Sequence, residues 1–436
     1  MKRLLITACL LLATPAHADD WPQWLGPKRD SVWREAGIVK KFPTGGLPVR
    51  WRIKVYDGFS GPAVANGLVY LTDYINKGGK ESNNPISRSN VKGIERVLCY
   101  RADNGKKIWS KEYPVEYKVS YSKGPRATPT IDGNRAYVLG TMGHLWCFNA
   151  KTGAIIWSKL LTKEYNVTVP FWGFCAHPLV DGDQLICLVG GKGSVAVSFD
   201  KNTGKEIWRS LSASGPGYCP PTMIRAAGVK QLVIWHPEAV NGLDPKTGKV
   251  HWTVPLKPDY GMSVTAPRQF GDYLYVSGHV RVGALLKLNS GSPGASIAWR
   301  GKPNLGVYCC NSTPLIDKGT IYGVCATQGQ LRAVDLKTGR RLWQTFAPTT
   351  GGKRVGHGTA YLVRVGATNR YFMFNELGEL VLAKFTPKKF EEISRMQVLK
   401  PTSPAGRLVC WSHPAFANKC IFLRNDKELV CLSAGK

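Results

Sequence analysis

The chain has 436 residues, enough for two or three domains on length alone. Its 59 lysines and arginines outnumber its 29 acidic residues, and the formal net charge is +30. No apolar segment of the sequence is long enough to span a bilayer, which excludes a protein built around transmembrane helices.

The N-terminal end has the pattern of an export signal. Met1, Lys2 and Arg3 precede an apolar run over residues 4–13, and Ala-His-Ala at 16–18 places small residues before a cleavage site. We therefore expect a periplasmic or secreted protein whose signal peptide comprises residues 1–18.

Two segments follow before the regular part of the chain. Residues 49–54, Val-Arg-Trp-Arg-Ile-Lys, form an apparent β-strand without neighbouring strands of its own. Residues 74–96 are a polar insertion rich in Asn, Ser, Gly and Lys. Loops of that length are usually functional or disordered, and of the two we expect disorder here.

An eleven-residue phrase then recurs along the chain. Each clear copy has a glycine four residues before a closing tryptophan, and these copies end at Trp109, Trp157, Trp208, Trp252 and Trp343, with a weaker copy at Trp299. Self-similarity at a period of roughly 45–50 residues indicates a solenoid or a propeller.

Each phrase belongs to a unit of four short strands separated by turns. Proline, which fits the first residue of a strand, opens most units, at Pro62, Pro129, Pro178, Pro221, Pro267, Pro314 and Pro414, with Ala360 in the remaining slot. Four-stranded units in radial array are propeller blades. The flat tryptophan on the last strand suits packing between neighbouring sheets.

The tryptophan series, beginning at Trp51 and with an eighth slot near Ile393, gives the blade count. The last unit, residues 415–432, lacks a fourth strand, which residues 49–54 supply, and this pairing closes the ring and removes open edges. We predict an all-β, eight-bladed propeller of four-stranded antiparallel blades over residues 49–436, after a lead-in at 19–48. Seven blades is the alternative if one degenerate unit is not a blade.

Cysteine and charge usage leave open interpretations. Cys99, Cys147 and Cys431 occupy equivalent strand positions in different blades, too far apart to bridge, so we expect small core residues. The basic charge is either a solvated rim or an attraction for a polyanion such as lipid headgroups or acidic polysaccharide. The export signal and the lack of a recognition motif exclude nucleic acid. We expect a monomer.

In a propeller, the segments that enter the inner strands line one mouth of the central channel. Aromatic, His, Cys and Arg side chains gather in these segments, at residues 56–60, 121–126, 171–177, 217–219, 260–262, 306–311, 354–357 and 410–413. They predict a small-molecule pocket; the alternative is that the aromatic rings plug the channel and the polar groups cap strand ends. The long insertion is expected on the same face.

Several residues of this mouth are candidate ligand contacts. The candidates for binding a cofactor are Lys123, Arg126, Trp172, Tyr218, Cys309, Cys310, Asn311, Arg354 and Trp411. Asp57 is the only carboxylate in the mouth segments and the one candidate catalytic acid. The sequence shows no paired carboxylates, Ser–His–Asp spacing or glycine-rich phosphate loop.

Two further groups of residues, an adjacent cysteine pair and three histidines, can each be interpreted in two ways. Cys309 and Cys310 could close a strained, labile disulfide, but we favour two free thiols that face opposite ways along the chain. His177, His357 and His413 are residue types that bind zinc or copper. Because their blades are spread round the ring, we expect no metal site from these three.

The repeated phrase, Ala-x-Asp-x-x-Thr-Gly-x-x-x-Trp at residues 333–343, resembles the repeat of pyrroloquinoline-quinone (PQQ) dehydrogenases and their noncatalytic relatives, which include the outer-membrane assembly lipoprotein BamB. The segment at 21–30, followed by Phe42-Pro43, is similar to the lead-in of exported PQQ-like propellers from planctomycete-type bacteria. The resemblance covers residues 49–436 and implies the propeller fold.

For activity, the resemblance implies either a PQQ dehydrogenase or one of its noncatalytic relatives. PQQ dehydrogenases hold the quinone between a vicinal disulfide and a tryptophan, with calcium and a catalytic aspartate beside it. By this likeness Cys309-Cys310 would cover the quinone, Trp172 or Trp411 would lie beneath it, and Arg126 or Arg354 would meet its carboxylates. The calcium ligands of those enzymes have no match in this chain.

Three functions are therefore weighed. We favour an exported, noncatalytic propeller that binds an envelope protein, a peptide or an anionic polysaccharide. The alternative is a PQQ- and calcium-dependent oxidoreductase acting on an alcohol or sugar hydroxyl. A metal-dependent lyase or hydrolase at the histidines is the third.

Overall fold

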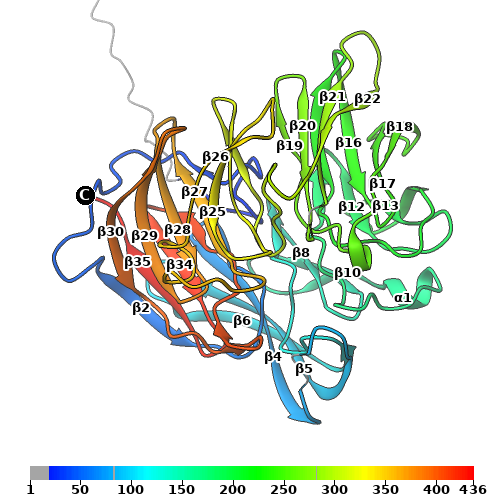
Figure 1. The fold of residues 1–436 in the computed structure, drawn as a ribbon. Helices are drawn as coiled ribbons and strands as arrows, with labels where there is room; N and C mark the ends of the chain where they lie inside the picture. Colours follow the sequence, from blue (N-terminus) through cyan, green and yellow to red (C-terminus); the bar gives the residue numbers. More distant parts are fainter. Residues whose placement is uncertain (1–18, 82–83, 281) are drawn as a thin grey trace, which may run out of the picture.

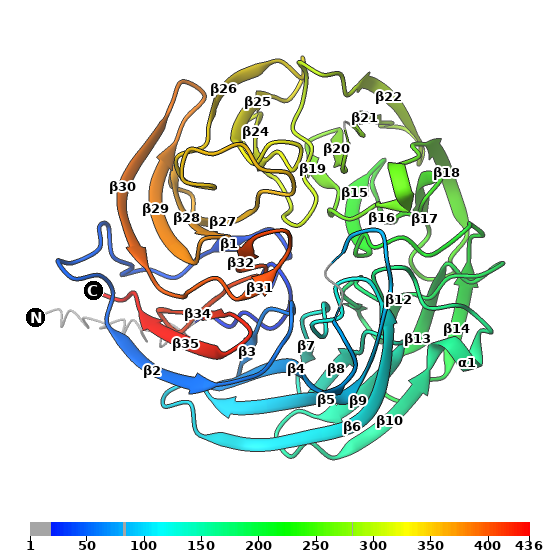
Figure 2. The same ribbon diagram turned by 60° about the horizontal axis from the view of Figure 1, so that its bottom comes forward.

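The computed structural model describes residues 19–81, 84–280 and 282–436; the expected signal peptide, residues 1–18, lies outside the described residues. Within these ranges the chain forms seven four-stranded sheets, one five-stranded sheet and a two-stranded ribbon. Figure 2 shows the larger sheets arranged radially about one axis. The prediction of an eight-bladed propeller is confirmed, and the seven-bladed alternative is wrong.

The strands of each blade run from the axis outward in chain order. The first four blades are β3–β6 (Ala63–Ala65, Leu68–Gly78, Ser89–Arg101, Lys107–Val119), β7–β10 (Thr130–Asp132, Arg135–Leu139, His144–Asn149, Ile155–Leu160), β11–β14 (Leu179–Asp181, Gln184–Leu188, Ala196–Asp200, Glu206–Ser210) and β15–β18 (Thr222–Ala226, Val229–Trp235, Ala239–Leu243, Val250–Pro255). The next three are β19–β22 (Arg268–Phe270, Tyr273–Ser277, Gly283–Leu288, Ala295–Arg300), β23–β26 (Leu315–Asp317, Thr320–Val324, Leu331–Asp335, Arg341–Thr345) and β27–β30 (Ala360–Val365, Arg370–Asn375, Glu379–Phe385, Phe390–Gln397).

The eighth blade is assembled from both ends of the chain, as predicted. Its strands are β33 (Ala415–Ala417), β34 (Cys420–Arg424), β35 (Glu428–Ser433) and β2 (Val49–Lys54). The remaining elements are β1 (Val32–Trp33), the ribbon β31 (Ser403–Pro404) with β32 (Leu408–Val409), the short helix α1 (Leu161–Glu164) and the 3-10 turn η1 (Asp259–Gly261). Figure 2 shows β2 beside β35, where the ring closes.

The glycine and tryptophan of the repeated phrase form the packing contact between neighbouring blades. Trp109 Nε1 donates a hydrogen bond to the carbonyl of Ala150 in the next blade (2.9 Å). Gly153 of that blade lies against the Trp109 ring, and a Cβ placed there would be 2.6 Å from Cδ2. The same arrangement joins Trp157 to Gly204. The phrase therefore has glycine because the ring of the preceding blade occupies the space of a side chain.

This contact gives a stability prediction with a matched control. Gly153 and Gly133 both have positive φ, of 71° and 55°, but a Cβ at Gly133 would meet nothing within 4 Å. We expect Gly153→Ala to cost about 1–3 kcal/mol more than Gly133→Ala, because only the first overpacks a buried ring. Urea unfolding of both variants measures the difference, and equal losses would show that the seam does not depend on this contact.

The polar insertion is ordered over most of its length, so the expectation of disorder is wrong. β4 pairs with β5 as far as Gly78 and Lys92, and β5 continues to pair with β6 as far as Ser89 and Val119. Figure 1 shows β4 and β5 extending below the other blades as one long hairpin. The alternating buried residues of β5 explain the order, because they give one face of the hairpin a core of its own.

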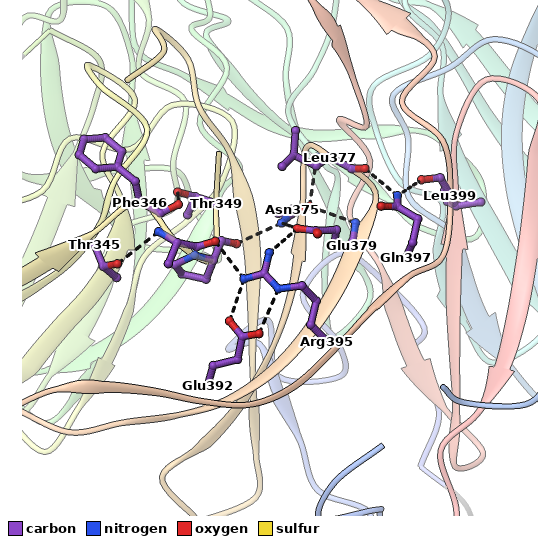
Figure 3. Close-up of polar contacts among 12 residues, drawn as sticks. Thr345, Phe346, Thr349, Asn375, Leu377, Glu379, Glu392, Arg395, Gln397 and Leu399 are labelled. Atoms are coloured by element: carbon purple, nitrogen blue, oxygen red, sulfur yellow. Dashed lines mark hydrogen bonds and ion pairs between the residues drawn. The ribbon is translucent and has the colours of Figure 1, made fainter. Parts of the chain in front are cut away.

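Blade seven, whose tryptophan has decayed, has a polar residue in its place. The position equivalent to the tryptophans is Ser394, which pairs with Leu382 just before a β-bulge, one residue beyond the predicted Ile393. Near it, Arg395 joins Glu379 (2.6 Å) and Glu392 (2.7 Å), as Figure 3 shows. These ion pairs lie within blade seven, and its contact with blade eight remains apolar, because residues of both blades belong to one buried cluster.

The lead-in, residues 19–48, packs on the propeller rather than extending from it. β1 pairs in parallel with β27, and Trp33 and Phe42 belong to the same buried cluster as strands β27, β28 and β34. The backbone N–H of Phe42 donates to Ser394 Oγ (3.1 Å). The eleven cysteines of the described residues are free thiols, and Cys99, Cys147 and Cys431 are buried.

Candidate functional site: the mouth of the channel

A cavity of about 410 Å³ lies at one mouth of the central channel. Each of the eight predicted mouth segments contributes at least one lining residue, for example Phe59 from the first and Trp411 from the last. Trp24 of the lead-in lines both this cavity and a second one of about 850 Å³, so its indole stands between them. The mouth segments therefore converge as the repeat predicted, and Trp24 is an unpredicted part of the wall.

Aromatic rings, those of four histidines included, belong to half of the residues that line the cavity. Trp172 and Tyr218 meet nearly edge to face, with ring centroids 5.5 Å apart, and Tyr121 and Trp411 lie 6.0 Å apart. Ile86, at the tip of the β4–β5 hairpin, also lines the cavity while 80% of its surface is exposed. The insertion therefore reaches the mouth, and these rings offer flat apolar faces to an occupant.

The candidate cations near the mouth are engaged within the protein. Lys123 Nζ lies 3.1 Å from Asp57, 3.4 Å from Glu81 and 3.9 Å from Asp426, and it does not line the cavity. Arg126 lines the cavity, but its guanidinium donates to the main-chain carbonyls of residues 120, 121 and 124 and lies over the Phe59 ring. Lys123 cannot bind an anion without losing these partners, and three of the five N–H groups of Arg126 are already used.

Asp57 and Arg354 lie outside the lining. Burial and the Asp426 carboxylate raise the pKa of Asp57 to about 6, against the opposing effect of Lys123. Asp57 is thus a member of an internal ion-pair network rather than an acid facing the cavity. Arg354 is exposed beyond the mouth.

The three candidate histidines divide between two groups. His177 stacks on Trp24, with centroids 4.6 Å apart, and His413 meets the same ring edge on at 5.7 Å. His177 Nδ1 accepts a hydrogen bond from the backbone N–H of Thr128 (2.9 Å). Burial lowers the pKa of both histidines. These two neutral imidazoles support the Trp24 floor of the cavity.

His357 lies instead with His279 and Cys310. Their ligand atoms are all within 4.8 Å of one another, and the two imidazoles stack with centroids 4.5 Å apart. Cys310 lines the cavity, whereas Cys309 is fully buried among blade five and six residues and its Sγ faces Gly323. The two thiols therefore face opposite sides of the chain.

Sequence reasoning missed His279 and Trp24. His279 follows β20 in a loop between second and third strands, and such loops share a face with the segments that enter the inner strands. A search of those loops for metal-binding side chains would have found it. Trp24 gave no such signal, because nothing in the lead-in pattern says that it folds back into the channel.

The lining does not fit the calcium and quinone that the resemblance implies. Calcium takes oxygen ligands, largely carboxylates, yet the described lining contains no aspartate or glutamate. Asn311 is its single side-chain amide, and the Arg126 guanidinium is already bound by carbonyl groups.

The fold and the cavity together define an eight-bladed propeller with a ligand-sized mouth on its axis. The family model described as "Outer membrane protein assembly factor BamB" matches residues 93–345. The chain belongs to this family of PQQ-like propellers. No curated protein sequence matched the chain.

Solved structures share the fold at low sequence identity. BamB from Moraxella catarrhalis is 16% identical, with a TM-score of 0.58 over 89% of this chain and 99% of its own. The quinohemoprotein alcohol dehydrogenase from Comamonas testosteroni is 12% identical, with a TM-score of 0.59 over 96% of this chain and 81% of its own. A europium-containing methanol dehydrogenase is 11% identical, with a TM-score of 0.60 over 96% and 90%.

Both a BamB and dehydrogenases thus have this architecture, and the likeness shows the fold alone. Among the described residues, no helix is both long and apolar enough to cross a membrane.

Proposed function

We propose that this chain is an exported, noncatalytic binding propeller of the cell envelope that captures a segment of an envelope protein at the channel mouth. The observation that carries the proposal is the aromatic cavity whose described lining has no carboxylate. A cavity of this kind accepts apolar and aromatic side chains and offers no carboxylate for general acid–base chemistry.

The surroundings of the cavity favour a protein partner. The exposed tip of the β4–β5 hairpin gives the mouth an apolar edge at Ile86, where an extended segment can lie before a side chain enters. The family is described as an assembly factor for outer-membrane proteins, which supports a partner of the same class. The net charge of +30 attracts an acidic partner from a distance and speeds its encounter.

Site-specific photo-cross-linking tests this function. With a photoreactive phenylalanine analogue at position 86 we expect cross-links to a protein in the envelope fraction. The same analogue at Ile155, an exposed position on the outer strand β10, should give none. Trp172→Ala should reduce the cross-links at position 86 several-fold, because it removes one of the ring faces that an entering side chain contacts.

Three results would contradict the proposal: equal cross-linking at positions 86 and 155, cross-linking insensitive to Trp172→Ala, or a cross-linked product that is glycan rather than peptide. Trp172 is only partly buried, so its replacement should leave the fold intact, and circular dichroism of the variant verifies that.

A further inference from the structure

One cluster of ligating side chains in the mouth has no part in the proposed capture of a protein. His279 follows β20 of blade five, Cys310 enters blade six, and His357 enters blade seven. Three consecutive blades therefore each bring one residue to the same wall of the cavity. It is the single group of three or more His, Cys, Asp or Glu within ligating distance that the described ranges contain.

The two imidazoles are in the protonation state that binds a metal. Burial, and then the neighbouring His357, lower the pKa of His279 to about 4. Burial, and then Arg407, lower the pKa of His357. At neutral pH both rings are therefore uncharged and each has a nitrogen lone pair to donate.

One imidazole nitrogen of the cluster is buried without a partner. Nδ1 of His279 is shielded from solvent and makes no hydrogen bond within the described structure. A buried polar atom left unpaired costs free energy, which a coordinated ion would recover. This atom is the clearest sign that the cluster is incomplete as the protein alone.

The backbone at His357 is held in an unusual conformation. His357 has a φ of 56°, in the left-handed region that few residues other than glycine adopt. Its N–H donates to the carbonyl of Ala326 (2.6 Å), and its own carbonyl accepts from Thr359 Oγ1 (2.9 Å). Such strain is concentrated at functional sites, and here it places the imidazole against His279.

We propose that His279, Cys310 and His357 form a transition-metal site, suited to Zn²⁺, in the wall of the mouth cavity. Two imidazoles and a thiolate are ligands that Zn²⁺ prefers, and three protein ligands leave a fourth position open. That position faces the cavity, because all three residues line it. The ion would thus add a charged anchor to a wall that is mostly apolar.

Binding requires a small contraction and the loss of one proton. Zn²⁺ holds nitrogen at about 2.0–2.1 Å and sulfur at about 2.3 Å, so ligand atoms now up to 4.8 Å apart must close by roughly 1 Å. Rotation of the half-buried imidazoles can supply this movement. Burial raises the pKa of the Cys310 thiol to about 12, so the ion displaces its proton on binding.

The test uses the whole reduced protein and the metals alone. After removal of adventitious metal with a chelator, Co²⁺ is titrated and the absorption spectrum recorded. We expect one Co²⁺ per chain, a thiolate-to-cobalt charge-transfer band, and loss of that band when Zn²⁺ is added. A reduced protein that binds neither ion stoichiometrically, or binds cobalt without the thiolate band, overturns the proposal.

Variants assign the ligands. Cys310→Ser should abolish the charge-transfer band and weaken Zn²⁺ binding by more than about 100-fold, since loss of a group that merely supports a ligand already costs about 10–100-fold. His279→Gln and His357→Gln should weaken binding likewise. Cys175→Ser is the matched control, because Cys175 lines the same cavity but lies outside the cluster.

Wild-type affinity in Cys310→Ser or in both histidine variants would overturn the assignment. The wild-type cobalt spectrum reports thiolate ligation even if a variant fails to fold. The site is also separable from the proposed function, because metal binding requires no protein partner and cross-linking from position 86 requires no metal.

Discussion

Replacing Trp51 by alanine is expected to lower the free energy of unfolding by about 3–5 kcal/mol, as loss of a large buried ring does. Trp51 is only 8% exposed although it lies on the first long strand of the chain. Its indole donates to the carbonyl of Ala102 (2.9 Å) and packs on Gly105, both in blade one. It also lies 5.8 Å from Phe422 of its own blade.

The effect is large because Trp51 closes the ring. β2 pairs with β35 so that Trp51 faces Cys431, which puts the two chain ends in one sheet. Arg424 of the same blade is fully buried and donates to the carbonyls of Tyr56 and Thr72, on the blade-one side of the seam. Weakening the seam therefore exposes the edges of two blades at once.

Two comparisons make the result decisive. Val49→Ala, on the same strand but 49% exposed, should cost less than about 0.5–1 kcal/mol. Trp157→Ala, at an interior seam where the indole donates to the carbonyl of Lys201 (3.1 Å), should cost about as much as Trp51→Ala. Denaturant unfolding measures all three. If Trp51→Ala costs no more than Val49→Ala, the ring is not closed by this pairing in solution.

The blades could be predicted from sequence because one local contact repeats. Glycine before tryptophan at fixed spacing encodes both the turn and the packing of a ring on the next sheet, so the motif itself specifies the neighbour. The eighth blade was predictable for the same reason. Trp51 has no partner strands nearby in sequence, so its strand had to pair with the last strands of the chain. The equivalent position in blade seven, Ser394, could not be predicted, because without the tryptophan nothing in the sequence indicates where the β-bulge lies.

The structures of the lead-in and of the insertion were harder to predict from the sequence. Trp24, Trp33 and Phe42 are scattered among glycines and prolines with neither strand nor helix periodicity, so their burial depends on tertiary contacts alone. In the insertion, polar residues suggested disorder, whereas the buried Val91 and Tyr117 support the hairpin from its inner face. Composition describes a segment as a whole and misses such alternation.

The site was predictable as a region but not as a set of partners. Sequence order gives the segments that reach the mouth, and all of them do. It does not give how far each side chain reaches across the channel. Trp24 contacts both His177 and His413, while His357 stacks on His279, which lies in a loop of blade five. Those pairings arise from loop conformation, such as the positive φ at His357.

The second large effect is a loss of stability in acid that depends on His413. Burial, and then the nearby Arg268 guanidinium, lower the pKa of His413 to about 3. In the unfolded chain the imidazole titrates near its ordinary value of about 6.5. As the pH falls below 6.5, the unfolded chain takes up a proton that the folded protein does not, so the free energy of unfolding decreases until the pH nears 3.

From pH 7 to pH 5 the loss due to His413 is about 2 kcal/mol, since each pH unit below the unfolded pKa contributes about 1.4 kcal/mol. His177, which stacks on Trp24, has its pKa lowered well below the ordinary value by burial, then by His413 and Arg29, and adds to the loss. Asp57 has the opposite effect on stability. Its pKa is raised to about 6 in the folded protein, so as the pH falls through 6 the folded protein binds a proton before the unfolded chain does.

Comparing variants isolates the contribution of His413 from these other groups. His413→Gln should be less stable at pH 7, because it loses the contacts with Trp24 and Tyr361, yet should lose about 2 kcal/mol less than wild type between pH 7 and pH 5. His251→Gln, at an exposed position of β18, should keep the wild-type pH dependence. Urea unfolding at both pH values measures the slope. An unchanged slope in His413→Gln would mean that this imidazole is solvated in the native state, and that the Trp24 floor of the mouth is open to water.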